Sequence, residues 1–261
     1  MSVICFILRA IYSSLLYFLV FDDKPFIVFK YYHFIPIMRK YQNLTIIGTS
    51  HIAIESVKLV EKTISEENPE IVALELDQPR FLSLISGEKR KLRLRDIKEL
   101  GIKGFIINLI GAWAEKKLGE LVGTPPGSDM LKAVESAKKA KADIALIDQD
   151  IRVTLRRLNK TLTWKEKLRF LWDIVKGFVQ RKQVVDFDLR KVPSEEVIEK
   201  LMVKVRKDYP SFYKVLVEER NVFMSKSLYK LMSLNKKIVA IVGAGHEKEI
   251  IRLIQERFEN G

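Results

Sequence analysis

The chain has 261 residues, of which 48% are hydrophobic and 30% are charged, a balance typical of globular proteins and not of disordered ones. The single cysteine, Cys5, excludes a disulfide framework and a cysteine-based zinc site, so any metal site must use His, Asp and Glu. The length suits one large domain or two small ones, and the net charge of +13 is compatible with an anionic partner.

The N-terminal segment is strongly apolar. Residues 3–21 are interrupted only by Arg9 and two serines, and this length approaches that of a membrane span. A basic cluster at its start and a small-residue cleavage pattern after it are both missing, so a signal peptide is a poor match. Three interpretations stay open for residues 1–37: a hydrophobic membrane anchor, an extension upstream of a functional chain that starts at Met38, and a packed helix.

Beyond Met38 the pattern alternates strands with helices. We expect a strand over 44–47, a helix from 51 to about 67 that ends at Asn68-Pro69, and a strand over 71–76. A strand, a helix and a second strand within so short a stretch form a βαβ unit with parallel strands and a right-handed crossover.

The middle of the chain favours helices. Residues 80–122 read as mostly helical, and TPPG at 124–127 is the clearest turn. Ser128-Asp129 can then cap another helix, which leads into a short strand over 144–147.

The segment from Arg152 to Lys182 holds ten Lys and Arg against two acidic residues. Such a surface suits nucleic acid, anionic lipid or an acidic protein, and it is also compatible with an ordinary solvated helix face. Aromatic side chains fall on its apolar stripe, which favours a membrane surface or a partner helix, and no specific nucleic acid is expected. The stripe consists of Trp164, Leu168, Leu171, Trp172, Val175, Phe178 and Val179.

A last strand over 238–242 and a last helix over 247–258 complete the pattern. The sequence therefore predicts an α/β fold: a central, mostly parallel sheet with helices on both faces and a helical insertion or cap. This domain is expected over residues 38–261.

Polar residues follow each of the four predicted strands, at the carboxyl ends where sites form in parallel sheets. If these strands are neighbours, imidazoles and carboxylates meet in one cleft. Two of the three histidines belong to this set, each in a Gly-x-x-His turn. The residues are His51, Glu75, Asp77, Asp148, Asp150 and His246.

Glycines accompany both histidines. Gly48, Gly243 and Gly245 are expected to supply a tight turn and positive φ, and to let backbone N–H groups approach a ligand at a helix N-terminus. A histidine at that position resists protonation and stays able to ligate metal or accept a proton. The alternative is that each residue is structural: a capping histidine, a strand-end turn, and Glu75 as a partner of Arg80.

Four segments together resemble one family. GTSHIAIESVKLVEKTISEENPEIVALELDQPRF, PGSDMLKAVESAKKAKADIALIDQDIRVTLRRL, EERNVFMSKSL and IVAIVGAGH are similar to the TraB/PrgY family of pheromone-shutdown proteins, within a superfamily that includes GumN and Tiki proteins. The resemblance implies an α/β fold whose active centre combines the two Gly-x-x-His motifs with the glutamate of ELD, here His51, His246 and Glu75. In the Tiki branch this centre is associated with divalent-metal-dependent peptidase activity.

The resemblance also implies supporting residues from the other motifs: Arg80, Asp148, Arg157, Glu219 and Arg220. One departure is Gln149, which follows Asp148 where the family usually has arginine. The first hypothesis is a metal-dependent peptidase in which His51, Glu75 and His246 bind a divalent cation and activate water, with Arg80 and Asp148 among the catalytic residues.

The second hypothesis is a module that binds a peptide or signal in the same cleft without turnover. The expected partner is thus a peptide or small substrate, with an anionic membrane surface as a further possibility. The expected location is cytoplasmic or membrane-associated, through residues 1–37 or through the basic surface.

Overall fold

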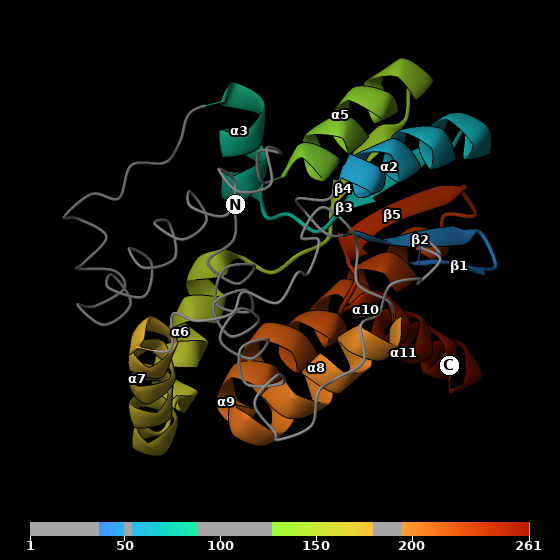
Figure 1. The fold of residues 1–261 in the computed structure, drawn as a ribbon. Coiled ribbons are helices and arrows are strands. Elements are labelled where there is room, and N and C mark those ends of the chain that lie inside the picture. The colour runs from blue at the N-terminus through green and yellow to red at the C-terminus, as the bar shows by residue number, and fades with distance from the viewer. Residues whose placement is uncertain (1–36, 50–53, 88–126, 180–194, 261) are drawn as a thin grey trace.

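The structure is a computed structural model of the chain and describes residues 37–49, 54–87, 127–179 and 195–260. Its centre is a five-stranded sheet in the order β1-β2-β5-β3-β4, in which β1 is antiparallel to β2 and all other pairs are parallel (Figure 1). The strands are β1 (Ile37–Tyr41), β2 (Leu44–Thr49), β3 (Ile71–Leu74), β4 (Asp143–Leu146) and β5 (Ile238–Gly243).

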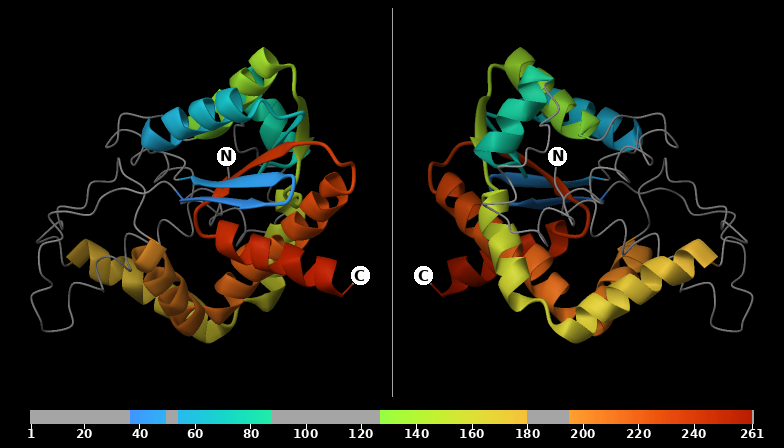
Figure 2. Two further views of the ribbon diagram at one scale, coloured as in Figure 1. Left: turned by 90° about the vertical axis from the view of Figure 1, so that its right-hand side faces the viewer. Right: turned by 90° about the vertical axis from the view of Figure 1, so that its left-hand side faces the viewer.

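Helices cover both faces of the sheet. Helices α2 and α5 lie on one face, and α10 and α11 lie on the other (Figures 1 and 2). Helices α6 to α9 extend beyond the sheet on the side of α10, whereas α3 lies on the side of α5 (Figure 1). The bounds are α2 (Ile54–Glu67), α3 (Gln78–Ser86), α5 (Ser128–Ala140), α6 (Ile151–Thr161), α7 (Trp164–Val179), α8 (Glu195–Asp208), α9 (Pro210–Tyr213), the π-helical turn η1 (Lys214–Glu218), α10 (Glu219–Met232) and α11 (Glu247–Glu259).

The central strands are apolar on both sides because both sides are buried. In β3, Ile71 and Ala73 pack into the layer of α10 and α11, whereas Val72 and Leu74 pack into the layer of α2 and α5. Successive side chains of a strand point to opposite faces, so an unbroken apolar run satisfies two cores at once. The predicted α/β fold, with a mostly parallel sheet and helices on both faces, is confirmed.

Some local predictions were incomplete or wrong. Strand β1 was not predicted, because its IMRKY sequence carries two cations and pairs only along one edge. Ser128-Asp129 does not cap α5: the N-cap is Gly127, at φ 85°, and the buried Asp129 side chain instead accepts a hydrogen bond of 2.7 Å from Thr49 Oγ1.

The predicted positive φ at the glycines beside the histidine turns was also wrong. Among the described glycines, positive φ occurs at Gly87 and Gly127. Gly48 is the penultimate residue of β2, and Gly243 is the last residue of β5. At Gly245 a β-carbon would meet the terminal methyl group of Met202, a flexible side chain that can turn aside at little cost.

Residues 1–36, including most of the proposed N-terminal anchor, and most of the predicted helical section 80–122 lie outside the described residues. In the part of the chain that is described, no helix combines the length and the apolar character needed to cross a bilayer.

Candidate functional site

Predicted site residues from three of the four strand ends lie at one edge of the sheet. Glu75 directly follows β3, Asp148 follows β4, and His246 follows β5. Strand β5 pairs with β3, and β3 pairs with β4, so the carboxyl ends of these strands are adjacent, as the predicted site requires. Strand β2 pairs with β5 on its other side. His51, which follows β2 in sequence, lies outside the described residues.

Arg220, from α10, connects the residues of this edge. Its Nε donates to Asp148 Oδ1 at 3.0 Å, and its NH2 donates to Asp148 Oδ2 at 2.6 Å and to Glu75 Oε1. Its NH1 donates to the backbone oxygen of Leu216 at 3.3 Å and contacts Nε2 of His246 at 3.1 Å. The residue is 1% exposed, so this guanidinium has exchanged water for four protein partners.

A second buried arginine, Arg80, approaches the same carboxylate. Its NH2 donates to Asp148 Oδ2 at 2.5 Å, and its Nε lies 3.1 Å from Asp77 Oδ1. Asp77 also caps α3 by accepting from the Arg80 N–H, and its other oxygen accepts from the backbone N–H of Ile151 at 2.7 Å. Asp77 therefore holds the first turns of α3 and α6 against the end of β3.

Glu75 is fixed at both carboxylate oxygens. Oε1 accepts from Arg220, and Oε2 accepts from the backbone N–H of Gly243 at 2.6 Å. This bond joins the end of β3 to the end of β5. The partner of Glu75 is thus Arg220, and not Arg80 as the structural alternative proposed from the sequence.

The contacts of His246 indicate which ring nitrogen carries the proton. A guanidinium has only donors, so Nε2 must accept from Arg220, and Nδ1 then donates to Asn221 Oδ1 at 2.6 Å. His246 is also the N-cap residue of α11, where the helix dipole disfavours an imidazolium. The position at the helix N-terminus and the contact with Arg220 both favour a neutral ring, whose Nε2 lies 3.7 Å from Glu75 Oε1.

We call the five charged residues of this edge the charge network: Glu75, Asp77, Arg80, Asp148 and Arg220. Their opposite charges stabilise one another. Burial alone would raise the pKa of Asp148, but the charges and hydrogen bonds of Arg220 and Arg80 outweigh burial and hold that pKa well below its usual range. Burial alone would lower the pKa of Arg220, and Asp148 and Glu75 raise it instead. Both groups are therefore ionised at neutral pH.

The atoms that a metal would need are engaged by Arg220. Glu75 Oε1 and His246 Nε2 lie 3.7 Å apart, near the roughly 3.0–3.5 Å that separates two ligands of one zinc ion. Both accept from the Arg220 guanidinium, whose positive charge would repel a second cation there. No group of three metal-ligating side chains occurs among the described residues. The third predicted ligand, His51, lies outside the described residues, and the divalent cation stays a prediction.

Two further predicted residues form a separate pair. Arg157 of α6 donates through Nε and NH2 to the carboxylate of Glu219, at 3.1 and 2.5 Å. The Arg157 side chain is exposed, and its partner precedes Arg220 in sequence. This exposed pair therefore connects α6 to the first residue of α10.

Asn221 is a member of the site that the sequence did not single out. Its side chain sets the orientation of His246, and it lies within the same EERN segment as Glu219 and Arg220. Its position next to Arg220, a predicted site residue, could have indicated Asn221 from the sequence. Consecutive residues on the sheet-facing side of a helix can contact the same strand end.

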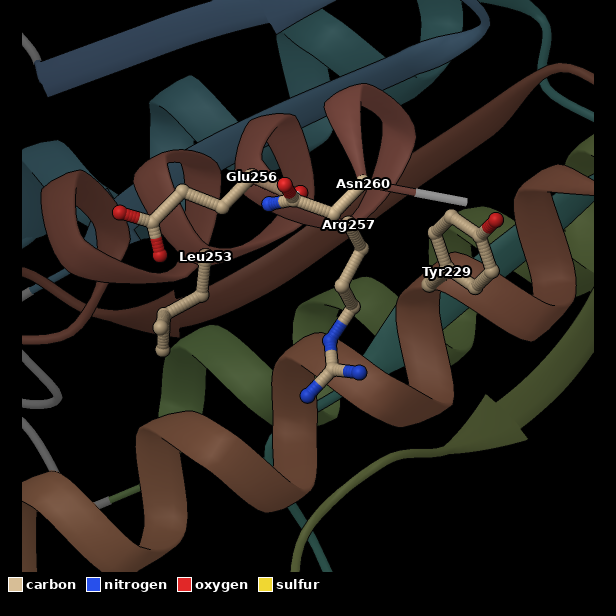
Figure 3. Close-up of a pocket in the computed structure, with 5 residues that line it drawn as sticks. All are labelled: Tyr229, Leu253, Glu256, Arg257 and Asn260. Atoms are coloured by element: carbon tan, nitrogen blue, oxygen red, sulfur yellow. The ribbon is translucent and has the colours of Figure 1, made fainter.

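A separate hollow occurs between α10 and α11. Figure 3 shows its lining side chains, of which one comes from α10, three come from α11 and one follows α11 directly. The hollow has a volume of about 450 Å³ and is open to solvent. It is lined by Tyr229, Leu253, Glu256, Arg257 and Asn260.

Comparison with known proteins places this arrangement in a family. An uncharacterized protein of Methanocaldococcus jannaschii is 40% identical over 220 residues, which cover 84% of this chain and 55% of that protein. The TraB domain-containing proteins of mouse and human are 26% and 25% identical over 196 and 194 residues, in each case 70% of this chain and 51% of the relative. The chain thus spans about half the length of the curated relatives it matches.

The family profile covers nearly all of the described structure. The match extends over residues 37–257, from the first residue of β1 into the last helix. It includes all five strands and every residue of the charge network. The chain belongs to the TraB/PrgY/gumN family.

Proposed function

We propose that the chain is a hydrolase that cleaves peptides at the carboxyl-terminal edge of its sheet. His246 acts as the proton acceptor, Glu75 as its carboxylate partner and Arg220 as the positive charge of the centre. The observation that carries the proposal is the 3.7 Å separation of His246 Nε2 and Glu75 Oε1, beside a guanidinium that contacts both atoms. Peptide is the substrate class that the resemblance to the Tiki branch implies, and His51 is the predicted further member.

Hydrolysis needs a base that takes a proton from water and a positive charge near the oxygen that becomes negative. Nε2 of His246 is the unprotonated ring nitrogen, but it accepts from Arg220 NH1. This contact must open before the nitrogen can take a proton. Arg220 can release it while Nε and NH2 stay bound to Asp148, and the released NH1 then faces the substrate.

The proton and the bonds balance without a further reactant. The water oxygen bonds to the peptide carbonyl carbon while its proton passes to His246 Nε2. The imidazolium so formed is stabilised by Glu75, and the negative carbonyl oxygen is stabilised by Arg220 NH1. The same proton then passes to the leaving amine as the C–N bond breaks.

The divalent cation predicted from the sequence enters no step, because two of its three candidate ligands, Glu75 and His246, already contact the Arg220 guanidinium. The cation stays a prediction, and metal analysis of the purified protein tests it. We expect cleavage to persist in a chelator. Loss of cleavage in the chelator, with recovery when a divalent metal is restored, would contradict the role given to Arg220.

The test of the reaction is cleavage of a peptide mixture by the full chain, followed by mass spectrometry. We expect new peptide termini with the wild type, none with His246→Ala, and wild-type cleavage with Arg252→Gln. Arg252 is a suitable control because it also pairs with two carboxylates, but on the exposed side of α11. Cleavage by a folded His246→Ala variant would overturn the proposal.

A second candidate function is peptide binding without turnover. The observation that favours it is that all five charged residues of the network pair with one another. The network is therefore stable without any group that reacts with a peptide. In that case the full chain would bind peptides in a calorimetric titration, Arg252→Gln would bind equally, and no new termini would form with any peptide.

A further inference from the structure

Helix α7 exposes three large apolar side chains along one stripe. Trp164 is 69% exposed, Leu168 is 64% exposed and Trp172 is 67% exposed. Residues four apart on a helix lie on the same face, so these three form a continuous ridge, called here the apolar ridge. Tryptophan is highly buried on average in soluble proteins. The side chains of the other predicted stripe members on this helix lie outside the described residues.

The opposite face of α7 holds the helix to the protein. Glu166 is buried and accepts from the backbone N–H of Ser211 at 2.7 Å. Phe170 packs against Phe212 with ring centroids 5.9 Å apart, and Asp173 accepts from the Tyr209 hydroxyl. These anchors recur at positions 166, 170 and 173, about half a turn from the apolar ridge. The orientation of the helix is therefore set by its own contacts, and it directs the ridge outward.

Cations border the apolar ridge on both sides. Lys165 and Arg169 are exposed on one side, and Lys167 lies on the other, with its Nζ 5.0 Å from the Trp164 ring centroid. The neighbouring helix α6 adds further exposed cations. The full set between residues 151 and 173 is Arg152, Arg156, Arg157, Lys160, Lys165, Lys167 and Arg169.

Acidic residues offset part of this charge. Three of the seven cations have an acidic partner: Arg152 pairs with Asp150, Arg157 with Glu219 and Arg169 with Asp208. The other four form no ion pair with another described residue, and the two acidic residues within the stretch, Glu166 and Asp173, face the anchoring side of α7. Helix α7 lies at the margin of the molecule, on the far side from α2 and α5 (Figures 1 and 2). The molecule thus presents an apolar ridge within a positively charged surface.

We propose that the apolar ridge and its bordering cations bind an anionic lipid surface, with α7 lying in the plane of the interface. A helix with tryptophan and leucine on one face and lysine and arginine beside it inserts its apolar face among headgroups, while the cations contact lipid phosphates. A second copy of this chain is a poorer occupant, because two surfaces of the same positive charge repel. Nucleic acid would pair with the cations, but it would leave the apolar ridge in water.

The experiment uses the full chain and vesicles of phosphatidylcholine with or without phosphatidylserine. We expect co-sedimentation only with the anionic vesicles, with a shift of tryptophan emission to shorter wavelength as the indoles leave water. Leu168→Gln combined with Trp172→Gln should abolish sedimentation. Val203→Gln combined with Leu234→Gln, at side chains that are 68% and 57% exposed, should not change it.

Charge is tested separately. Arg156→Glu combined with Lys165→Glu should weaken vesicle binding by roughly tenfold or more, since each cation near an anionic surface contributes on the order of one kcal/mol. Lys58→Glu combined with Lys138→Glu, at exposed lysines of α2 and α5, makes the same change in net charge at a distance and should leave most of the binding.

Three outcomes would overturn the proposal: no sedimentation with anionic vesicles at low salt, equal losses in the test and control variants, or binding to heparin without binding to vesicles. The last would assign the surface to a polyanion. None of these measurements depends on peptide cleavage, so the proposed hydrolase and the proposed membrane surface can fail independently.

Discussion

The charge network at the sheet edge and the surface of α6 and α7 use the same residue types in opposite ways. In the network, Arg80 and Arg220 are buried, and each contacts two carboxylates. On α6 and α7, cations are exposed beside an exposed apolar ridge. A buried ion has no water to replace a lost partner, whereas an exposed ion does. We therefore expect substitutions in the network to change stability, and substitutions on the ridge to change only binding.

Replacement of Arg220 by methionine has the largest expected effect. It leaves the buried carboxylates of Glu75 and Asp148 without this cation. Breaking a buried ion pair in this way lowers the free energy of unfolding by about 3–5 kcal/mol. Urea unfolding followed by circular dichroism measures the loss. Arg252→Met is the matched control, because Arg252 also pairs with two carboxylates but has a side chain that is 52% exposed. Equal shifts of the urea midpoint would show that burial is not the deciding difference.

Asp148→Asn should have the next largest effect. It weakens hydrogen bonds to Arg80 and Arg220, so we expect the free energy of unfolding to fall by about 2–3 kcal/mol at neutral pH. The pKa of Asp148 is lowered in the folded state, so its contribution is full above about pH 4 and is lost as the pH falls through the folded-state value. Urea unfolding at a series of acidic pH values should show the difference between wild type and variant shrinking as the pH falls. A difference that stays constant with pH would contradict this account.

Glu166→Ala tests the attachment of α7 and has a smaller expected effect. Glu166 accepts from the backbone N–H of Thr163 at 3.0 Å and from that of Ser211 at 2.7 Å, so it both caps α7 and holds it to α9. Loss of such a cap costs about 1 kcal/mol. Hydrogen exchange of the Ser211 amide should become faster, while Lys165→Ala, in the same turn, should leave it unchanged. Unchanged exchange in Glu166→Ala would mean that other contacts hold the helix.

The apolar ridge should give the smallest change in stability. Leu168→Gln and Trp172→Gln alter side chains that are already largely in water, so each should change the free energy of unfolding by no more than about 0.5 kcal/mol. Thermal unfolding measures this directly. A clear loss of stability in either variant would indicate that the ridge contributes to the folded core.

The parts that could be predicted from the sequence are those that local patterns determine. Unbroken apolar runs such as IVAL in β3 identify buried strands, and the residue that follows each run must lie at the sheet edge. Glu75, Asp148 and His246 were placed together on that basis, and the structure brings them together.

Long-range partners and exposure could not be predicted in this way. Arg220 is separated from Glu75 by 145 residues, and nothing near either one indicates the pairing, so the closer Arg80 was the natural assignment. The apolar spacing of α7 is the same whether its stripe faces a core or solvent. Only the anchors at Glu166, Phe170 and Asp173 decide between the two, because they hold the opposite face.

The most direct test of the central claim is the ¹⁵N NMR spectrum of the imidazole of His246, assigned by comparison with His246→Gln. In the free protein we predict a neutral ring with the proton on Nδ1 and an Nε2 that accepts from Arg220. Addition of a cleavable peptide should change the Nε2 signal, because Arg220 must release that nitrogen for it to take a proton. A proton on Nε2 in the free protein, or a spectrum that peptide leaves unchanged, would contradict the account.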